Sequence, residues 1–268
     1  MSSEHYTHGH HDSVLRSHSW RTVENSAAYL VPFLAPGLDV LDVGSGPGTI
    51  SLDLAQRVAP GTVLGIDASA GVVATASTAA EAARVENVRF EVGDAYALDL
   101  PDDSFDVVHA HQVLQHLSDP VAALREMRRV LRPGGILAVR DVDYAGASWF
   151  PRLRGLTLWM ETYQTLARQN QGEPDAGPEL KAWVRAAGFA DVTETASTWC
   201  FSTDDDRAWW GGSWAERTTA SDFATQAVDA GIADRDRLAE IAAAWRAWAA
   251  DEDGVFFMPH GEVIARKA

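Results

Sequence analysis

Short apolar runs alternate with amphipathic stretches through the first half of the chain. Five runs read as buried strands, at residues 40–43, 63–66, 88–92, 105–109 and 136–142. The stretches with helical spacing between them are 50–58, 72–84 and 120–131, and the last ends at a sharp turn over 132–135. Strands that alternate with helices predict an α/β fold with a parallel sheet and right-handed crossovers. Ligands bind such a sheet beyond the carboxyl ends of its strands, so the polar residues there form the candidate site.

The pattern is less regular on either side of this region. Apolar residues from Trp20 to Leu34 fall at helical spacing, which predicts one helix ending near Pro36 and Gly37. The later segments are an aromatic-rich stretch at 145–177, a helix at 178–187, a strand at 192–199, a polar Trp-rich insertion at 202–253 and a strand at 256–267. We therefore expect a doubly wound, mostly parallel seven-stranded sheet with a helical cap.

The strongest local signal follows the first strand, in the run Val40-Leu41-Asp42-Val43-Gly44-Ser45-Gly46-Pro47-Gly48-Thr49. Glycines let the backbone turn tightly and approach a ligand, and the next helix points its free N–H groups at that ligand. The dinucleotide fingerprint G-x-G-x-x-G would need glycine where Thr49 stands. Asp42, just before the loop, suits a ligand with an ammonium group better than one with a pyrophosphate.

This D-x-G-x-G-x-G run resembles motif I of the class I S-adenosylmethionine (SAM) dependent methyltransferases, particularly the group that includes the ubiquinone and menaquinone C-methyltransferases. Three more segments resemble that group in the same order, at 65–69, 93–95 and 131–137. The resemblance covers about residues 38–142 and thins quickly outside them. It implies a Rossmann-like fold, SAM as the cofactor and S-adenosylhomocysteine (SAH) as its product.

The resemblance also implies which side chains hold the cofactor. It places Asp67 on the ribose hydroxyls, where a carboxylate can accept two hydrogen bonds, and Asp94 against the adenine amino group. His111 and Gln112, after the fourth strand, are expected near the methionine part of SAM. Arg16 or Arg21 is expected to clamp the SAM carboxylate, and Tyr6 to lie in a segment that covers the cofactor. The predicted cofactor-binding residues are Tyr6, Arg21, Asp42, Gly44, Ser45, Gly46, Asp67, Ala68, Asp94, Ala95, His111 and Gln112.

Histidines supply the candidate catalytic groups. A base is needed if the acceptor loses a proton, and imidazole suits that task near neutral pH. We expect His11 and His111 on the two sides of the methyl group. His109 shares a face with His111, and His116 is expected to pack or to form a hydrogen bond. The N-terminal cluster 8–11 lacks a recognisable metal-ligand spacing, so no metal is predicted, although a metal site is the alternative.

The region after the fifth strand offers candidates for the acceptor side. Asp141 and Asp143 could line the substrate mouth, or they could end a solvated strand. Several large aromatic side chains are expected to divide between the core of the cap and an aromatic acceptor pocket. They are Trp149, Phe150, Trp159, Trp209, Trp210 and Trp214.

Composition and net charge limit the classes of binding partner that suit this protein. The formal net charge is −16 and the sequence pI is near 4.8, which disfavours nucleic acid and membrane surfaces as partners. A neutral or cationic small-molecule acceptor suits this surface better than a polyanion does. No apolar run reaches membrane-spanning length, residues 1–11 are too polar for a signal peptide, and Cys200 is the only cysteine. We therefore expect a cytoplasmic protein, and the sequence leaves monomer and homodimer open.

These observations predict a SAM-dependent methyltransferase that acts by in-line displacement on a small, partly apolar metabolite, in quinone or specialised metabolism. The alternatives are a SAM-binding cyclase or regulator and, less favoured by Asp42 and Thr49, a nicotinamide-dependent oxidoreductase. The expected division is an N-terminal helical lid (1–36), a SAM-binding core (37–144), a cap insertion (145–177), more core (178–200), a second cap insertion (201–254) and a final core strand (255–268).

Overall fold

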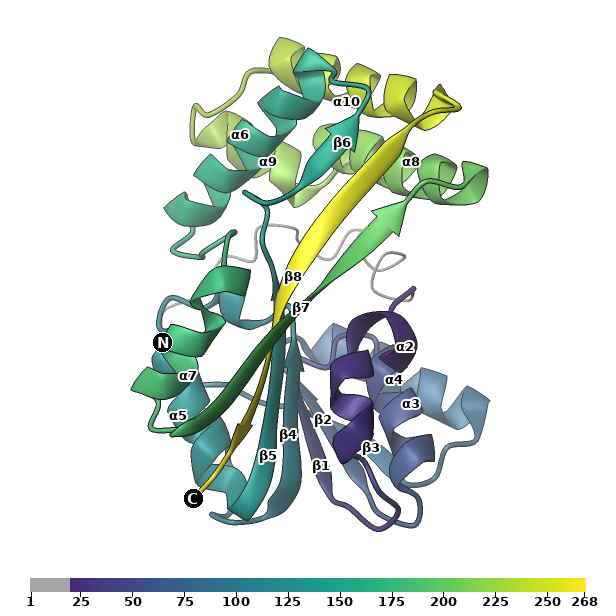
Figure 1. The fold of residues 1–268 in the computed structure, drawn as a ribbon. Helices are drawn as coiled ribbons and strands as arrows, with labels where there is room; N and C mark the ends of the chain where they lie inside the picture. Colours follow the sequence, from purple (N-terminus) through teal and green to yellow (C-terminus); the bar gives the residue numbers. More distant parts are fainter. Residues whose placement is uncertain (1–19) are drawn as a thin grey trace.

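The computed structural model describes residues 20–268, which build a sheet flanked by helices with a helical layer above it (Figure 1). The core strands are β1 (Val40–Val43), β2 (Val63–Asp67), β3 (Val88–Val92), β4 (Phe105–His111) and β5 (Leu131–Val142). The helices among them are α3 (Thr49–Val58), α4 (Ala70–Ala83), η2 (Leu114–His116) and α5 (Pro120–Val130). η3 (Gly177–Glu179), α7 (Leu180–Ala186), β7 (Asp191–Phe201) and β8 (Val255–Arg266) complete the core.

The sheet has the order β3-β2-β1-β4-β5-β8-β6, and β7 pairs with β8. The five core strands are parallel, whereas β8 runs antiparallel to β5, β6 and β7. A doubly wound, mostly parallel sheet is therefore confirmed, with eight strands in place of the seven expected. The additional strand is β6 (Ser148–Phe150), a three-residue strand inside the aromatic-rich stretch, too short to give a periodic signal.

Apolar side chains on the two faces of the sheet pack against different helices. On one face, Val40 and Val107 pack with Leu54 of α3 and with Leu30 of the N-terminal segment. The opposite face packs against α5 and α7, through side chains such as Leu124, which are completely buried. Figure 1 shows α3 and α4 on one side and α5 and α7 on the other. This arrangement leaves the carboxyl ends of β1, β2 and β4 open to a ligand.

The N-terminal helix predicted to end near Pro36 is instead two short pieces. They are α2 (Val23–Ser26) and the 3₁₀ helix η1 (Ala28–Phe33). α2 begins with a capping box in which the Thr22 side chain accepts from Asn25 N–H, and Ala27 then leaves the helical conformation. Pro32, inside η1, has no N–H to continue a helical ladder. The prediction of one continuous helix was wrong for these local reasons.

The predicted turn over 132–135 lies within β5. Phe105 of β4 pairs with Leu131, and the ladder shifts before it resumes with Val107 opposite Ile136. β5 advances five residues across this shift while β4 advances two, and Gly134 within it has a φ of +79°, in the left-handed region. The chain therefore turns without leaving the strand.

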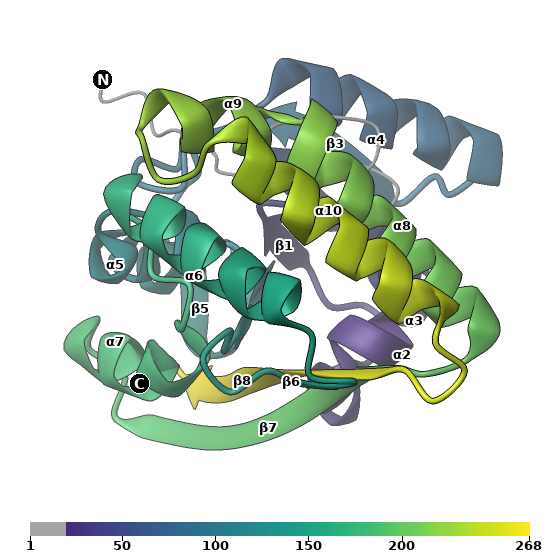
Figure 2. The same ribbon diagram turned by 90° about the horizontal axis from the view of Figure 1, so that it is seen from above.

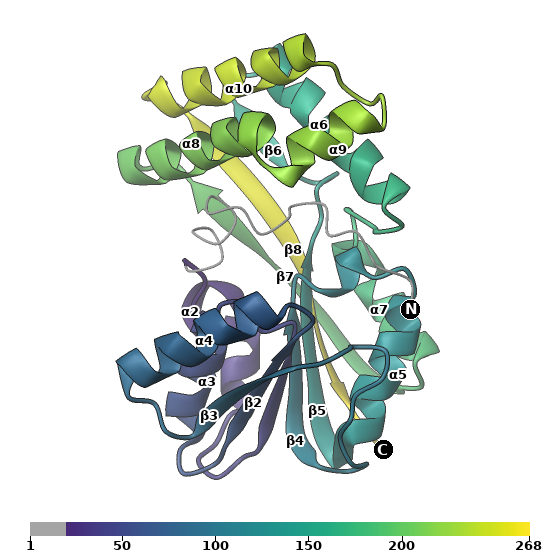
Figure 3. The same ribbon diagram turned by 180° about the vertical axis from the view of Figure 1, so that it is seen from behind.

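Four helices form the cap: α6 (Arg154–Gln169), α8 (Asp204–Ala220), α9 (Asp222–Asp229) and α10 (Arg235–Ala250). α8 starts at a capping box on Thr203 and carries three aspartates in its first turn, which suits the positive end of the helix dipole. Trp159, Trp214, Trp245 and other aromatic residues fill the cap interior. β7 and β8 extend from the core up into this layer (Figures 1 and 2), so the cap is joined to the core by continuous strands. Figure 3 shows the same two layers from behind.

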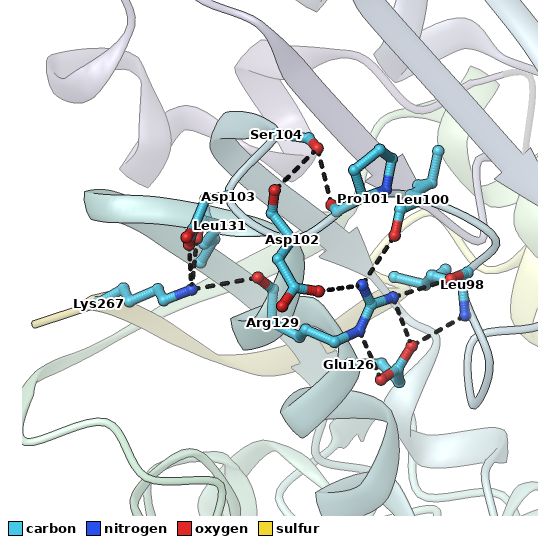
Figure 4. Close-up of polar contacts among 10 residues, drawn as sticks. All are labelled: Leu98, Leu100, Pro101, Asp102, Asp103, Ser104, Glu126, Arg129, Leu131 and Lys267. Atoms are coloured by element: carbon cyan, nitrogen blue, oxygen red, sulfur yellow. Dashed lines mark hydrogen bonds and ion pairs between the residues drawn. The ribbon is translucent and has the colours of Figure 1, made fainter.

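A polar cluster on the side of the core opposite the cap ties the loop before β4 to α5 and to the chain end (Figure 4). The Arg129 guanidinium donates to Leu98 O at 2.8 Å and Leu100 O at 2.7 Å, and pairs with Glu126 and Asp102. Lys267 Nζ donates to Leu131 O, at 2.7 Å, and also to Arg129 O and Asp103. The cluster holds the loop in place far from the open ends of the strands.

We predict that Arg129→Met lowers the free energy of unfolding by about 2 kcal/mol, because two carbonyls and two carboxylates lose a donor together. For a chain of this size that corresponds to a fall in Tm of roughly 4–8 °C, measurable by calorimetry. Arg89→Met is the matched control, because the Arg89–Glu91 pair is largely exposed and should contribute little. Equal Tm shifts in the two variants would contradict this role for Arg129.

Within residues 20–268, no helix combines the length and the apolar composition needed to cross a membrane.

Candidate active site

A cavity of about 500 Å³ opens at the carboxyl ends of β1, β2 and β4, a size typical of small-ligand sites. Its walls come from the loops after these strands and after β3, from the first turns of α3 and α4, and from Arg21, which precedes α2. Every predicted cofactor residue within 20–268 lines it: Arg21, Asp42, Gly44, Ser45, Gly46, Asp67, Ala68, Asp94, Ala95, His111 and Gln112. The structure thus brings together residues that are up to 91 positions apart. The contact that each makes with a cofactor stays a prediction.

The glycine loop is shaped by close approach as well as by backbone angles. Gly44 has a φ of +69°, and a Cβ there would lie 2.4 Å from a methyl group of Val113. Gly48 has a φ of +85°, and a Cβ there would lie 2.6 Å from the Phe90 ring. Both positions therefore need glycine for two independent reasons. The loop ends at the N-terminus of α3, whose first two residues, Thr49 and Ile50, line the cavity.

Asp67 does more than end the second strand. One carboxylate oxygen accepts from Gly46 N–H at 3.1 Å, and the other accepts from Ser69 N–H at 3.0 Å. The side chain thus braces the glycine loop while it lines the cavity, which the sequence alone did not reveal. Asp94 accepts from Tyr96 N–H at 2.9 Å in the same way. The end of the cavity beside β2 and β3 is therefore acidic and preorganised.

Asp42 lies beneath the glycine loop and is 3% exposed. Its two carboxylate oxygens contact His109 Nδ1 at 2.8 Å and Ser51 Oγ at 2.5 Å. The pairing of Asp42 with His109 explains why a histidine can stand in the buried fourth strand. A carboxylate has lone pairs left after two such contacts, so the predicted ammonium contact stays a prediction.

His111 stands at the other end of the cavity, on the same face as His109. It is 5% exposed, and among the described residues neither of its ring nitrogens has a hydrogen-bond partner. Its ring centroid lies 5.7 Å from that of Trp199 and 6.2 Å from that of His260. Burial, and then the nearby Arg21 and Arg140 guanidiniums, hold the pKa of His111 well below 6.5. The imidazole is therefore neutral and free to accept a proton.

Gln112 links three elements at this end. Its φ is +54°, a left-handed conformation that is unusual for a non-glycine residue. Its side-chain oxygen accepts from Arg21 at 2.6 Å, and its side-chain nitrogen lies 2.8 Å from His260 Nε2. His260 was missed in the sequence, because nothing local in the final strand signals that it contacts Gln112 at the cavity wall. Only the pairing of β5 with β8 places it there.

The remaining histidine of the cavity wall, His116, lies 3.1 Å from the Gln115 side-chain amide through its Nε2 atom. Burial, and then Arg21, lower its pKa to about 3, so it too is neutral. The hydrogen-bonding role expected for His116 agrees with this contact.

Asp141 and Asp143 were considered as residues of the substrate mouth, but neither lines the cavity. Asp141 is completely buried beneath η2 and accepts from Gln115 N–H at 3.3 Å, so it does not line the cavity. Asp143 accepts from Gly146 N–H at 3.0 Å, a local turn contact. Among the described residues, no tryptophan lines the cavity either; Trp159, Trp210 and Trp214 form the cap core.

We predict that Asp141→Asn stabilises the protein more at pH 8 than at pH 5. Burial raises the pKa of Asp141 to about 8, from 3.8 for an ordinary aspartate. Between these values the unfolded chain releases a proton that the folded chain keeps, so the stability contributed by Asp141 is lost as pH rises. The loss is at most about 1.4 kcal/mol per pH unit. Urea unfolding of both proteins at pH 5, 6.5 and 8 checks this, and a pH-independent difference would contradict it.

Several predicted site residues lie outside the described residues. They are Tyr6, His11, Arg16 and the remaining histidines of the N-terminal cluster. Within 20–268, no group of three or more His, Cys, Asp or Glu side chains is placed to hold a metal ion.

Comparisons with known proteins place this geometry in context. A family model described as a methyltransferase domain matches residues 34–201. The chain is 32% identical over 270 residues to an uncharacterised methyltransferase of Schizosaccharomyces pombe, covering 98% of this chain and 96% of the other. It is 36% identical over 151 residues to the demethylmenaquinone methyltransferase of Beutenbergia cavernae, covering 56% of this chain and 59% of the other. The solved YcgJ protein of Bacillus subtilis matches the fold with a TM-score of 0.60 at 23% identity, covering 91% of this chain and 98% of that one.

Proposed function

Because the chain belongs to the methyltransferase domain family and is a SAM-dependent methyltransferase, we propose that its cavity holds SAM along the glycine loop and methylates a small, partly apolar metabolite. The observation that carries this proposal is the cavity itself, which gathers residues of three of the four family-like segments, the glycine loop, 65–69 and 93–95, around one space. The family match favours methyl transfer over the nicotinamide-dependent and regulatory alternatives.

The residues present fit SAM. Gly44 and Gly46 line the cavity without side chains, and Asp67 faces the cavity from the end of β2, where ribose hydroxyls would find an acceptor. The buried Ser45 hydroxyl lines the cavity, and among the described residues it has no hydrogen-bond partner, so it is available to a ligand. Arg21, at the far end, supplies a guanidinium for the carboxylate of the methionine part.

His111 is the proposed base. When bound, SAM supplies an electrophilic methyl group on a positively charged sulfur, so the protein mainly aligns the acceptor and excludes water. A neutral imidazole nitrogen of His111 accepts the proton from an acceptor hydroxyl or activated carbon. Burial, and then the Arg21 and Arg140 guanidiniums, disfavour the imidazolium form of His111, so the base is neutral before the acceptor gives up its proton.

The acceptor is proposed to be neutral overall and aromatic or quinol-like. Val43, Ile66, Val113 and Leu117 give the cavity apolar walls between its polar ends. The net charge of −16 disfavours polyanionic substrates. The similarity to a demethylmenaquinone methyltransferase supports a quinol as a member of this acceptor class.

The test is transfer of labelled methyl from SAM to a matched panel of quinols, phenols, carboxylic acids and aliphatic amines. Label should enter quinols or phenols, with one SAH formed per methyl transferred. Label that enters amines alone would contradict His111 as a base for an acidic proton. Tight SAM binding without SAH formation with any member would contradict methyl transfer to this class of acceptor.

A further inference from the structure

A chain of three polar side chains runs from the last strand to the wall of the cavity. His260 Nδ1 lies 3.0 Å from Met258 O, in its own strand, and His260 Nε2 lies 2.8 Å from Gln112 Nε2. Gln112 Oε1 in turn accepts from Arg21 at 2.6 Å. His260 is 1% exposed and Gln112 lines the cavity beside Arg21. The histidine thus reaches the cavity only through the other two side chains.

The donors and acceptors of this chain fit in one arrangement. A guanidinium only donates, so Gln112 must present its oxygen to Arg21 and its NH₂ group to His260. His260 Nε2 must then be an unprotonated acceptor, which requires the imidazole proton on Nδ1. Met258 O stands at Nδ1 and accepts that proton. Each contact therefore determines the orientation of the next.

The surroundings keep His260 in the required neutral form. Burial lowers the pKa of His260 well below 6.5, and the Arg140 and Arg21 guanidiniums lower it further. A protonated ring would place an N–H against the Gln112 amide and force that amide to turn its NH₂ group toward Arg21. The neutral tautomer avoids this clash of donors.

The segment that carries Arg21 is held in place separately. Trp199 of β7 donates through its indole nitrogen to Asn25 O at 2.6 Å, and its ring lies 5.2 Å from that of Trp20. These contacts hold the backbone beside Arg21, and the hydrogen bond to Gln112 holds its guanidinium at the cavity wall. The guanidinium also lies over the Trp199 ring, at 5.8 Å from the centroid.

We infer that His260 is a positioning residue that acts through Gln112 to aim the Arg21 guanidinium at the carboxylate of the methyl donor. The inference rests on the proposed function, in which Arg21 binds that carboxylate. It makes β8, a strand that also pairs with the cap strand β6, part of the machinery that selects the amino-acid end of the cofactor.

The test compares His260→Met with His260→Gln by calorimetric titration. Met removes the acceptor at similar volume, whereas the Gln oxygen can stand where Nε2 accepts from Gln112. SAH and 5′-methylthioadenosine are the two probes, since the second lacks the carboxylate. We expect His260→Met to weaken SAH binding roughly tenfold, the effect of one charge-assisted hydrogen bond, and to leave methylthioadenosine binding unchanged. His260→Gln should restore SAH binding to within about threefold of wild type, because it keeps the acceptor.

Arg21→Met separates the inference from the proposed function. If Arg21→Met weakens SAH binding and His260→Met does not, the inference is wrong and the proposed role of Arg21 stands. If Arg21→Met leaves SAH binding unchanged, the carboxylate role of Arg21 fails, and the inference fails with it. If His260→Met does not fold, Gln112→Met breaks the same chain from the cavity side and should show the same selective loss. Equal losses for both probes would overturn the inference, because they would indicate a general disturbance of the site.

Discussion

His111→Gln is expected to lower kcat by a factor of roughly 10² to 10⁴ while SAH binding stays within about threefold of wild type. The imidazole is buried at the cavity wall, and among the described residues its ring nitrogens have no partner, so its removal takes away a proton acceptor and breaks no hydrogen bond. Glutamine keeps the polarity and most of the volume without a basic nitrogen. Single-turnover kinetics with labelled SAM and a quinol acceptor, beside SAH titration, separates the two effects.

The pH dependence gives a second check on His111. Because its pKa lies well below the ordinary 6.5, wild-type kcat should be flat from about pH 6.5 upward, with the base already neutral. It should fall only at lower pH, where the imidazole takes a proton. Cys200→Ser, an exposed change on β7, is the control and should keep both the rate and the profile. Full turnover by His111→Gln with normal SAH binding would show that His111 is not the catalytic base.

Asp67→Ala is expected to weaken SAM binding by roughly a hundredfold or more, about 3 kcal/mol. Two ribose hydroxyls would lose a charged acceptor, and the N–H groups of Gly46 and Ser69 would lose the partner that braces the glycine loop. Calorimetric titration of the variant with SAM measures the loss directly. Glu81→Ala, at an exposed position of α4, removes an acid without touching the cavity and should bind SAM normally. Unchanged binding by Asp67→Ala would show that the ribose lies elsewhere.

Much of the core and one side of the site could be predicted because their signals are local. The apolar runs predicted the parallel strands, and the acidic residues lie at the strand ends: Asp67 is the last residue of β2 and Asp94 comes two residues after β3. Loops after parallel strands meet at one edge, so proximity followed from topology. The division into lid, core and cap segments remains a prediction.

The parts that could not be predicted depend on contacts between distant segments. Gln112 and His260 are 148 positions apart, and their contact depends on the register of β8 against β5. Pairing of Asp42 with His109 likewise depends on the register of β1 against β4. Asp141 was expected at the substrate mouth or at a solvated strand end, but it is buried. Alternation along a strand does not tell which face of the sheet the next helix covers.

The predictions of one N-terminal helix and of seven strands were wrong because the elements involved are short. α2 spans four residues and β6 spans three, below what periodicity can resolve. The aromatic residues of the cap were expected to divide between core and pocket. Trp159 and Trp214 do pack in the core of the cap, against Trp245, but none of the six named aromatic residues lines the described cavity.

Calorimetric titration of the wild-type protein with SAH, with NADH as the control ligand, tests the central claim most directly. We predict micromolar binding of SAH with one site per chain and no detectable heat with NADH. Binding of NADH without SAH by the folded protein would contradict the assignment of the glycine loop and of the whole cavity to SAM.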